Sequence, residues 1–145
     1  EPNAREKASF LKENIRPIEE SGQLRHLPLP SKDFLTGTEL GFDVLFVDGH
    51  TEKQMIPHIQ YQGKTLVFMA DLLPTVGHIP LAYVMGYDVR PLITLDEKAK
   101  FLNKAADEGY YLFLEHDYEN QICTVKHTEK GVRLDRTYQF EEVFN

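Results

Sequence analysis

The segment that decides the fold is residues 47–59, VDGHTEKQMIPHI, which overlaps the end of the largely apolar run of residues 42–47, FDVLFV. A run of this kind predicts a buried β-strand. The strand leads at once into Asp48, Gly49 and His50. A glycine turn followed by histidine can hold an imidazole at the rim of a sheet, where it could meet a metal ion or a substrate. This interpretation requires partner residues elsewhere in the chain.

The composition bounds the class of protein. The chain has 145 residues, 41% of them apolar and 11% aromatic, which is enough for one domain with its own core. The 16 basic residues against 23 acidic ones give a net charge of −7. Such a surface repels phosphate backbones and anionic lipids, so we expect neither a nucleic acid nor a membrane as a partner. The single cysteine, Cys123, excludes an internal disulfide and is predicted to be a small strand side chain rather than a reactive thiol.

No stretch of the sequence has the character of a membrane span or a targeting segment. No apolar run approaches the roughly 18 residues of a membrane span, and the first residues, EPNAREK, lack the apolar core of a signal peptide. We therefore expect a soluble protein and assign it to the cytoplasm. The chain begins with Glu1 rather than methionine, so a targeting segment encoded upstream would not be visible.

The first half of the chain is predicted to contain one helix and three strands. Residues 4–20 carry apolar side chains at three- and four-residue spacing, which predicts an amphipathic helix interrupted near Pro17. These side chains are Ala8, Leu11, Ile15 and Ile18. The predicted strands are residues 42–47, 56–61 and 64–70, with a tight turn at Gln62-Gly63 between the last two.

The second half begins with a long connection. Residues 72–93 contain three prolines and predict an irregular loop with at most one helical turn. Thr94 and Glu97 are spaced as a capping box, and Gly109 is placed to end the helix that follows. The remaining predicted strands are residues 110–114, 121–127 and 132–140. The sequence contains no repeat or linker, so we expect a single unit.

Three apolar strands are each followed by a side chain that can bind a metal. These side chains are His50, Asp71 and His116. If the strands run in the same direction, the three groups meet at a common edge of the sheet, where α/β folds place their sites. Two imidazoles and a carboxylate suit zinc or a similar transition metal. The alternatives are that His50 is an ordinary turn residue and that Asp71 caps backbone N–H groups in a loop.

The other histidines carry weaker patterns. His58 lies inside the second predicted strand, so we expect it to pack or face solvent rather than bind a metal. His26 and His127 stand in polar surroundings without a supporting motif. His78 follows Asp71 in the long connection, where a surface position and a pocket position are equally compatible with the sequence.

The order of these motifs resembles the metallo-β-lactamase-fold hydrolase superfamily. Asp48-Gly49-His50-Thr51 is similar to its histidine turn, Ala70-Asp71-Leu72-Leu73 to its aspartate motif, and Glu115-His116-Asp117 to its last histidine motif. Tyr87-Asp88 and the following helix occur in the same order, so the resemblance covers most of residues 42–120. Two positions depart from the family pattern: Glu52-Lys53-Gln54 replaces Pro-Gly-His, and Ala70 stands where glycine usually precedes the aspartate.

The resemblance implies an α/β fold, the four-layer αββα sandwich. The family's upstream His-x-His-x-Asp-His motif is missing, since no two histidines of this chain are closer than eight residues apart. Residues 1–145 therefore resemble the C-terminal half of such a domain, a mixed sheet with flanking helices. This half alone should expose one apolar face of its sheet. We expect that face to pair with the N-terminal half of the same fold or to self-associate.

The resemblance also implies a function. His50 and His116 would each bind one metal and Asp71 would bridge the pair, with two zinc ions, or iron or manganese, in the intact enzyme. Hydroxide generated on the metals would attack an ester, lactone or related acyl bond of a small-molecule substrate, while this half alone would be inactive. His78, Tyr83 and Tyr87 are the candidates for substrate contact. The alternatives are a phosphoester hydrolase of the same fold and a non-catalytic, metal-free binding module.

Overall fold

The computed structural model describes residues 2–144, so the outermost positions of the predicted range, 1 and 145, lie outside it. The chain divides into two compact units, Glu1–Pro30 and Ser31–Asn145, rather than the single unit expected. In the first unit the helix α1 covers only Lys12–Glu20, with Pro17 inside it and no buried residue. The predicted helix over residues 4–20 is therefore too long at its N-terminal end, where turns precede α1.

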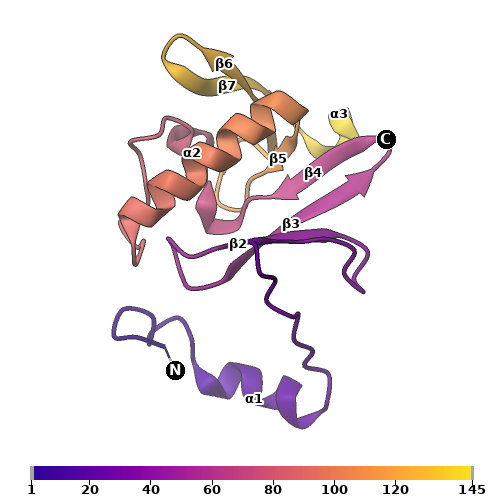
Figure 1. The fold of residues 1–145 in the computed structure, drawn as a ribbon, viewed down its shortest axis with the longest axis vertical. Coiled ribbons are helices and arrows are strands. Elements are labelled where there is room, and N and C mark those ends of the chain that lie inside the picture. Colours follow the sequence, from indigo (N-terminus) through magenta and orange to yellow (C-terminus); the bar gives the residue numbers. More distant parts are fainter. Residues whose placement is uncertain (1, 145) are drawn as a thin grey trace. The chain divides into compact units, whose positions relative to one another are not determined.

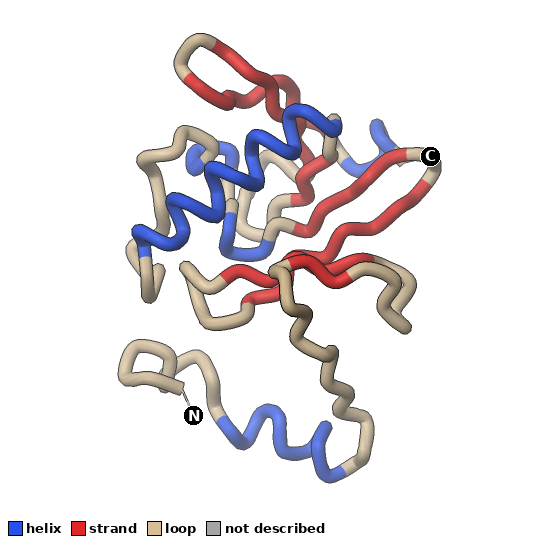
Figure 2. Tube along the Cα trace, in the orientation of Figure 1, coloured by secondary structure: helices blue, strands red, loops and turns tan. Residues whose placement is uncertain are grey.

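The second unit is built on one mixed sheet of seven strands in sequential order (Figures 1 and 2). The strands are β1 (Phe34–Leu35), β2 (Asp43–Val47), β3 (Gln54–Tyr61), β4 (Lys64–Phe68), β5 (Tyr111–Phe113), β6 (Ile122–Thr128) and β7 (Gly131–Tyr138). Neighbouring strands are antiparallel, except that β4 and β5 are parallel. Six of the strands were predicted to within three residues at each end. The two-residue β1 was not.

The parallel pair β4 and β5 requires a long crossover, and this connection carries two short 3-10 helices and the long helix of the unit. It contains the short 3-10 helices η1 (Ala70–Leu72) and η2 (Val76–His78), followed by the helix α2 (Pro91–Glu108). One helical turn was predicted as possible in the proline-rich connection of residues 72–93, and η2 is such a turn. Within residues 2–144 no helix is both long and apolar enough to cross a bilayer.

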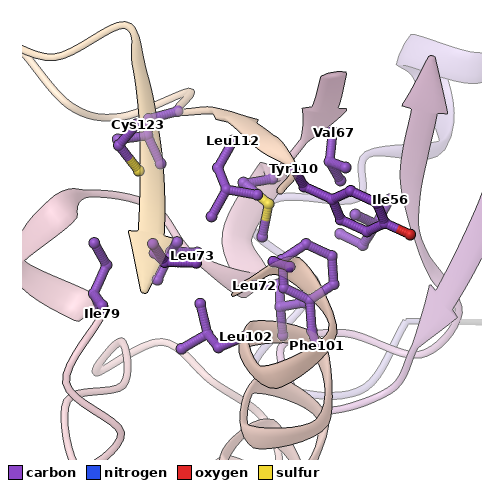
Figure 3. Packing of buried hydrophobic residues seen from close by; sticks show 14 of the residues in the cluster. Ile56, Val67, Leu72, Leu73, Ile79, Phe101, Leu102, Tyr110, Leu112 and Cys123 are labelled. Atoms are coloured by element: carbon purple, nitrogen blue, oxygen red, sulfur yellow. The ribbon is translucent and has the colours of Figure 1, made fainter. Parts of the chain in front are cut away.

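Helix α2 packs on one face of the sheet and forms the main core with it. Phe101, Leu102 and Ala105 of α2 are buried against the sheet. Their partners include Ile56, Val67, Leu112 and Cys123, which Figure 3 shows gathered around the helix. Paired residues on adjacent strands share a face, and His58, Val67, Leu112 and Cys123 are paired in succession across β3 to β6. Cys123 lies in β6, as predicted for a strand side chain, and is fully buried in this core.

The opposite face of the sheet is also apolar but is covered less completely. The short helix α3 (Phe140–Val143) and Phe144 pack there on Ile122. Phe68 and Phe113 stack on this face with ring centroids 5.9 Å apart. Met55 and Tyr61 of β3 remain 50% and 54% exposed. The two faces therefore differ, one covered by the long helix α2 and one covered only in part by the short helix α3.

The predicted capping box at Thr94 is wrong. The helix α2 begins four residues earlier than predicted, with Arg90 as its N-cap and Pro91 at its first position, and Thr94 is buried inside its first turn. Proline is well suited to the first helical position, since its fixed φ is helical and its missing N–H is not needed there. The C-terminal prediction is confirmed, because Gly109 ends α2 with a left-handed φ of 66°.

Candidate metal centre

Three strands of the sheet run in the same direction and bring His50, Asp71 and His116 to one edge. β2 and β4 are both antiparallel to β3, and β5 is parallel to β4. His50 follows β2, Asp71 lies in η1 after β4, and His116 follows β5. Nε2 of His50 lies 3.3 Å from Oδ2 of Asp71, and Nε2 of His116 lies 3.1 Å from Oδ1 of the same carboxylate.

Each of these two contacts is an imidazole–carboxylate ion pair, and the same arrangement is compatible with a carboxylate that would be shared by two metal ions. Two ligands bound about 2.0–2.1 Å from a tetrahedral ion are separated by about 3.3 Å. Each imidazole stands at about this separation from a different oxygen of Asp71, so the carboxylate could bridge two ions. Among residues 2–144 no three His, Cys, Asp or Glu side chains form a group that could hold one ion. The described residues thus supply two ligands to each position, and further ligands would have to come from elsewhere.

Asp88 fixes the orientation of the His50 ring. Oδ1 of Asp88 lies 2.9 Å from Nδ1 of His50, and the carboxylate side chain is fully buried. An ionised carboxylate can only accept, and with such a partner Nδ1 of His50 is the donor. Nε2 is then the ring atom that faces Asp71, and its lone pair can bind a metal ion or a proton. A carboxylate behind a metal-binding histidine is the usual outer partner of such a ligand.

The turn that carries His50 is held tightly against helix α2. The carboxylate of Glu97 accepts hydrogen bonds from the backbone N–H of Asp48 at 2.6 Å and of Gly49 at 3.0 Å. Burial raises the pKa of Glu97, and the two amide hydrogen bonds partly oppose this shift. A Cβ on Gly49 would lie 2.3 Å from Oγ1 and 2.4 Å from the backbone N of Thr94, so only glycine fits here.

The residue before Asp71 has a backbone conformation that is unusual for alanine. Ala70 adopts a φ of +42°, in the left-handed region that favours glycine. This accounts for the family's glycine at the position. Nε2 of Gln54 lies 3.4 Å from Oδ2 of Asp71, while Oε1 of Gln54 is buried without a hydrogen-bond partner. Gln54 stands where the family's Pro-Gly-His ends in histidine, and it is a neighbour of the site that the sequence analysis did not include.

His116 is held through the residue that follows it. Asp117 accepts hydrogen bonds from the backbone N–H groups of Val76, Glu119 and Asn120 at 2.9–3.1 Å. Burial opposes ionisation of Asp117, but these hydrogen bonds outweigh it and lower its pKa. The backbone N–H of His116 also donates to the carbonyl of Pro74 at 3.3 Å. The ring of His116 remains 50% exposed, so it is the more accessible of the two imidazoles.

The three predicted substrate contacts are not joined to this cluster by any described hydrogen bond, ion pair or ring contact within residues 2–144. Nδ1 of His78 lies 2.9 Å from Oγ1 of Thr75, and burial lowers the pKa of His78. Tyr83 and Tyr87 are 61% and 78% exposed. Their roles remain predictions.

The loop that holds these residues is anchored by a buried lysine. Nζ of Lys98 donates to the carbonyl of His78 at 2.9 Å and also to the carbonyl of Tyr83. Lys98 is 1% exposed, and burial lowers its pKa to about 8. The sequence analysis gave Lys98 no role, because a lysine in a helix normally faces solvent.

Comparison with known proteins identifies the fold through solved structures. No known family and no curated protein matches the sequence. A probable metal-dependent hydrolase from Staphylococcus aureus matches 97% of this chain with a TM-score of 0.74 and 24% identity. The hydrolase AbOPH of the β-lactamase superfamily matches 88% with a TM-score of 0.72 and 18% identity. AidC, a dizinc quorum-quenching lactonase, matches 94% with a TM-score of 0.67 and 18% identity.

The predicted fold is therefore confirmed as part of a metallo-β-lactamase fold. The chain spans 47%, 43% and 48% of these three structures, about half of each. The mixed sheet and its flanking helices agree with one half of the αββα sandwich. At these identities the likeness establishes the fold, and function has to be argued from the site.

Proposed function

We propose that this chain is the C-terminal half of a metal-dependent hydrolase and contributes His50, Asp71 and His116 to a two-metal site. The observation that carries the proposal is the pair of imidazoles, each facing a different oxygen of Asp71 at 3.3 and 3.1 Å. An N-terminal half with the His-x-His-x-Asp-His motif would complete both positions. Zinc is the expected metal, because imidazole and carboxylate ligands suit it, with iron or manganese as alternatives.

The residues of this chain have distinct roles in such a site. Two bound metal ions would supply an activated water at neutral pH and polarise the oxygen of the substrate. Asp71 holds the two positions together, and its own orientation is supported by Gln54. Asp88 keeps the hydrogen of His50 on Nδ1, which leaves Nε2 free to act as a ligand. His116, half exposed, stands on the side that a substrate could approach.

The proposed substrate is a small ester, lactone or related acyl compound. The support is the likeness to AidC, which is a lactonase bound to an N-acyl homoserine product. Phosphoester hydrolysis by the same site is the second candidate reaction. A binding module without metals is the third, and it is favoured by the two incomplete metal positions in the described chain.

The incompletely covered sheet face supports the proposal that an N-terminal half packs on this chain. Residues of this face line up across β3 to β5, as the pairings of Ile59 with Leu66 and of Phe68 with Phe113 show. Met55 and Tyr61 are half exposed on the same face. In an αββα sandwich this is the face that packs on the other sheet. Self-association of this chain is the competing way to cover it.

The test is reconstitution with an N-terminal half. This chain would be co-expressed with the upstream-encoded segment, and the purified complex would be assayed for metal content and for hydrolysis of lactone, carboxylic ester and phosphoester substrates. We expect about two metal ions per complex, lactone or ester hydrolysis, and loss of both in Asp71→Ala and His116→Ala.

The controls separate the competing functions. His127→Ala removes an exposed histidine whose Nε2 lies 2.7 Å from Oδ1 of Asp107, and it should leave metal content and turnover unchanged. Turnover confined to phosphoesters would select the second candidate. A folded complex that contains no metal and turns over none of the substrates would refute the enzyme and support the binding module.

A further inference from the structure

A cavity of about 200 Å³ lies between the β1–β3 edge of the sheet and helix α2. Phe34 of β1, Leu45 of β2 and Phe101 of α2 line it, and none of the three candidate metal ligands does. An engineered apolar cavity of about 150 Å³ is large enough to bind benzene. The cavity can therefore hold a single aromatic ring with a small substituent.

His58 gives the wall of the cavity a ring nitrogen that can accept a hydrogen bond. The residue is 4% exposed. Nδ1 of His58 lies 3.0 Å from the carbonyl oxygen of Ile56, which can only accept, so Nδ1 carries the hydrogen. Burial lowers the pKa of His58, which keeps the ring neutral at pH 7. Nε2 is then an acceptor, and the described residues provide it with no hydrogen bond.

The surroundings of His58 are aromatic. Phe34, Phe101 and Tyr110 meet its ring edge to face, with centroids 5.1, 6.0 and 5.6 Å away. Phe34 and Phe101 also line the cavity, so a bound ring would find further aromatic edges and faces there. Water is a poorer occupant, since it needs two to four polar partners and most of this wall is apolar.

The charged residues of the lining select for a neutral ligand. They are two acids, Asp33 and Glu97, and two bases, Lys100 and Lys104. Lys104 is engaged over the ring of Phe34, with its Nζ 5.0 Å from the centroid. Glu97 is engaged with the backbone of Asp48 and Gly49. Acidic and basic residues are equal in number, so the lining has no formal excess of either sign.

We propose that this cavity is a second small-molecule site, separate from the candidate metal centre, and that it binds a neutral aromatic compound with one hydroxyl group. The ring lies between Phe34, Leu45 and Phe101, and the hydroxyl donates to Nε2 of His58. The proposal uses no metal and no residue of an N-terminal half, so it stands or fails independently of the hydrolase proposal.

Phenol is the probe, and toluene is the matched compound without the donor. Both would be titrated into the chain of residues 1–145, with the imidazole nitrogens of His58 observed by NMR. We expect saturable phenol binding with a shift of the His58 Nε2 resonance that toluene does not produce. In His58→Phe, which keeps a ring but removes the acceptor, the affinity ratio of phenol to toluene should fall roughly three- to tenfold.

A cavity-filling variant tests the location without touching His58. Leu45→Phe should weaken the binding of both compounds, whereas Ile59→Phe, on the opposite face of β3, should not. Absence of saturable binding, a phenol complex that leaves His58 Nε2 unshifted, or full affinity in Leu45→Phe would each overturn the proposal.

Discussion

Gly49→Ala is the most direct perturbation of the turn that carries His50. The added Cβ would lie 2.3 Å from Oγ1, 2.4 Å from N and 2.6 Å from Cα of Thr94. Two of these atoms belong to the backbone of helix α2, so no change of rotamer relieves the contact. The turn has to move away from the helix by about 1 Å to reach ordinary van der Waals separation.

The expected loss of stability follows from two terms. Overpacking of this kind costs about 1–3 kcal/mol. The same movement lengthens the hydrogen bonds that Glu97 accepts from Asp48 and Gly49, and losing one bond to a charged group costs about 1.5–3 kcal/mol. Alanine also lowers the conformational entropy of the unfolded chain, which offsets about 0.4–1 kcal/mol of this destabilisation. We expect a net destabilisation of about 3 kcal/mol.

Urea unfolding of the 145-residue chain measures this value. Gly86→Ala is the matched control, because a Cβ there meets no atom within 4 Å, and it should change the free energy of unfolding by less than about 0.5 kcal/mol. Adding Thr94→Ala to Gly49→Ala removes only the Oγ1 contact and should recover less than half of the loss. A loss below about 1 kcal/mol, or full recovery with Thr94→Ala, would refute the close approach to the α2 backbone.

Three further predictions concern the residues around the turn. Glu97→Gln keeps one acceptor for two backbone donors, so we expect a loss of about 1–2 kcal/mol by the same urea assay, and no loss would contradict the double hydrogen bond. Asp88→Asn weakens the partner of His50, so in the reconstituted complex we expect a roughly tenfold loss of zinc affinity in chelator competition, whereas an unchanged affinity would remove Asp88 from the site. Lys98 has its pKa lowered by burial from 10.5 to about 8. The unfolded chain therefore binds more protons between these pH values, and stability relative to Lys98→Met should rise by up to about 3 kcal/mol from pH 8 to pH 10.5, while a fall would contradict the direction of the shift.

The sequence predicted the elements whose signals are local. Apolar runs located β2, β4 and β5, and the shared direction of these strands explains why the residues that follow them meet at one edge. Gly109 was predicted as the end of a helix because a left-handed C-terminal cap favours glycine. The juxtaposition of His50 and His116 with Asp71 was thus accessible from strand order alone.

The failures arose where tertiary contacts override local patterns. Glu97 has the spacing of a capping residue relative to Thr94, yet its carboxylate binds the backbone of a turn almost 50 residues earlier. Lys98 is the next residue of the same helix and is buried because backbone carbonyls of the preceding loop accept its hydrogen bonds. Neither pairing leaves a periodic trace in the sequence. A buried charge within a helix would be found only by asking which distant donors or acceptors need a partner.

On the proposed function, metal binding and association of the two halves are linked equilibria. This chain offers each metal position one imidazole nitrogen and one oxygen of Asp71. Two ligands per ion leave the isolated chain with weak metal affinity, and the ion gains its remaining ligands only when the other half docks. By linkage, any ion that binds the assembled site more tightly than the separate halves must strengthen their association by the same factor. The apolar sheet face then supplies the affinity that is independent of metal, so a chelator should weaken the complex without abolishing it.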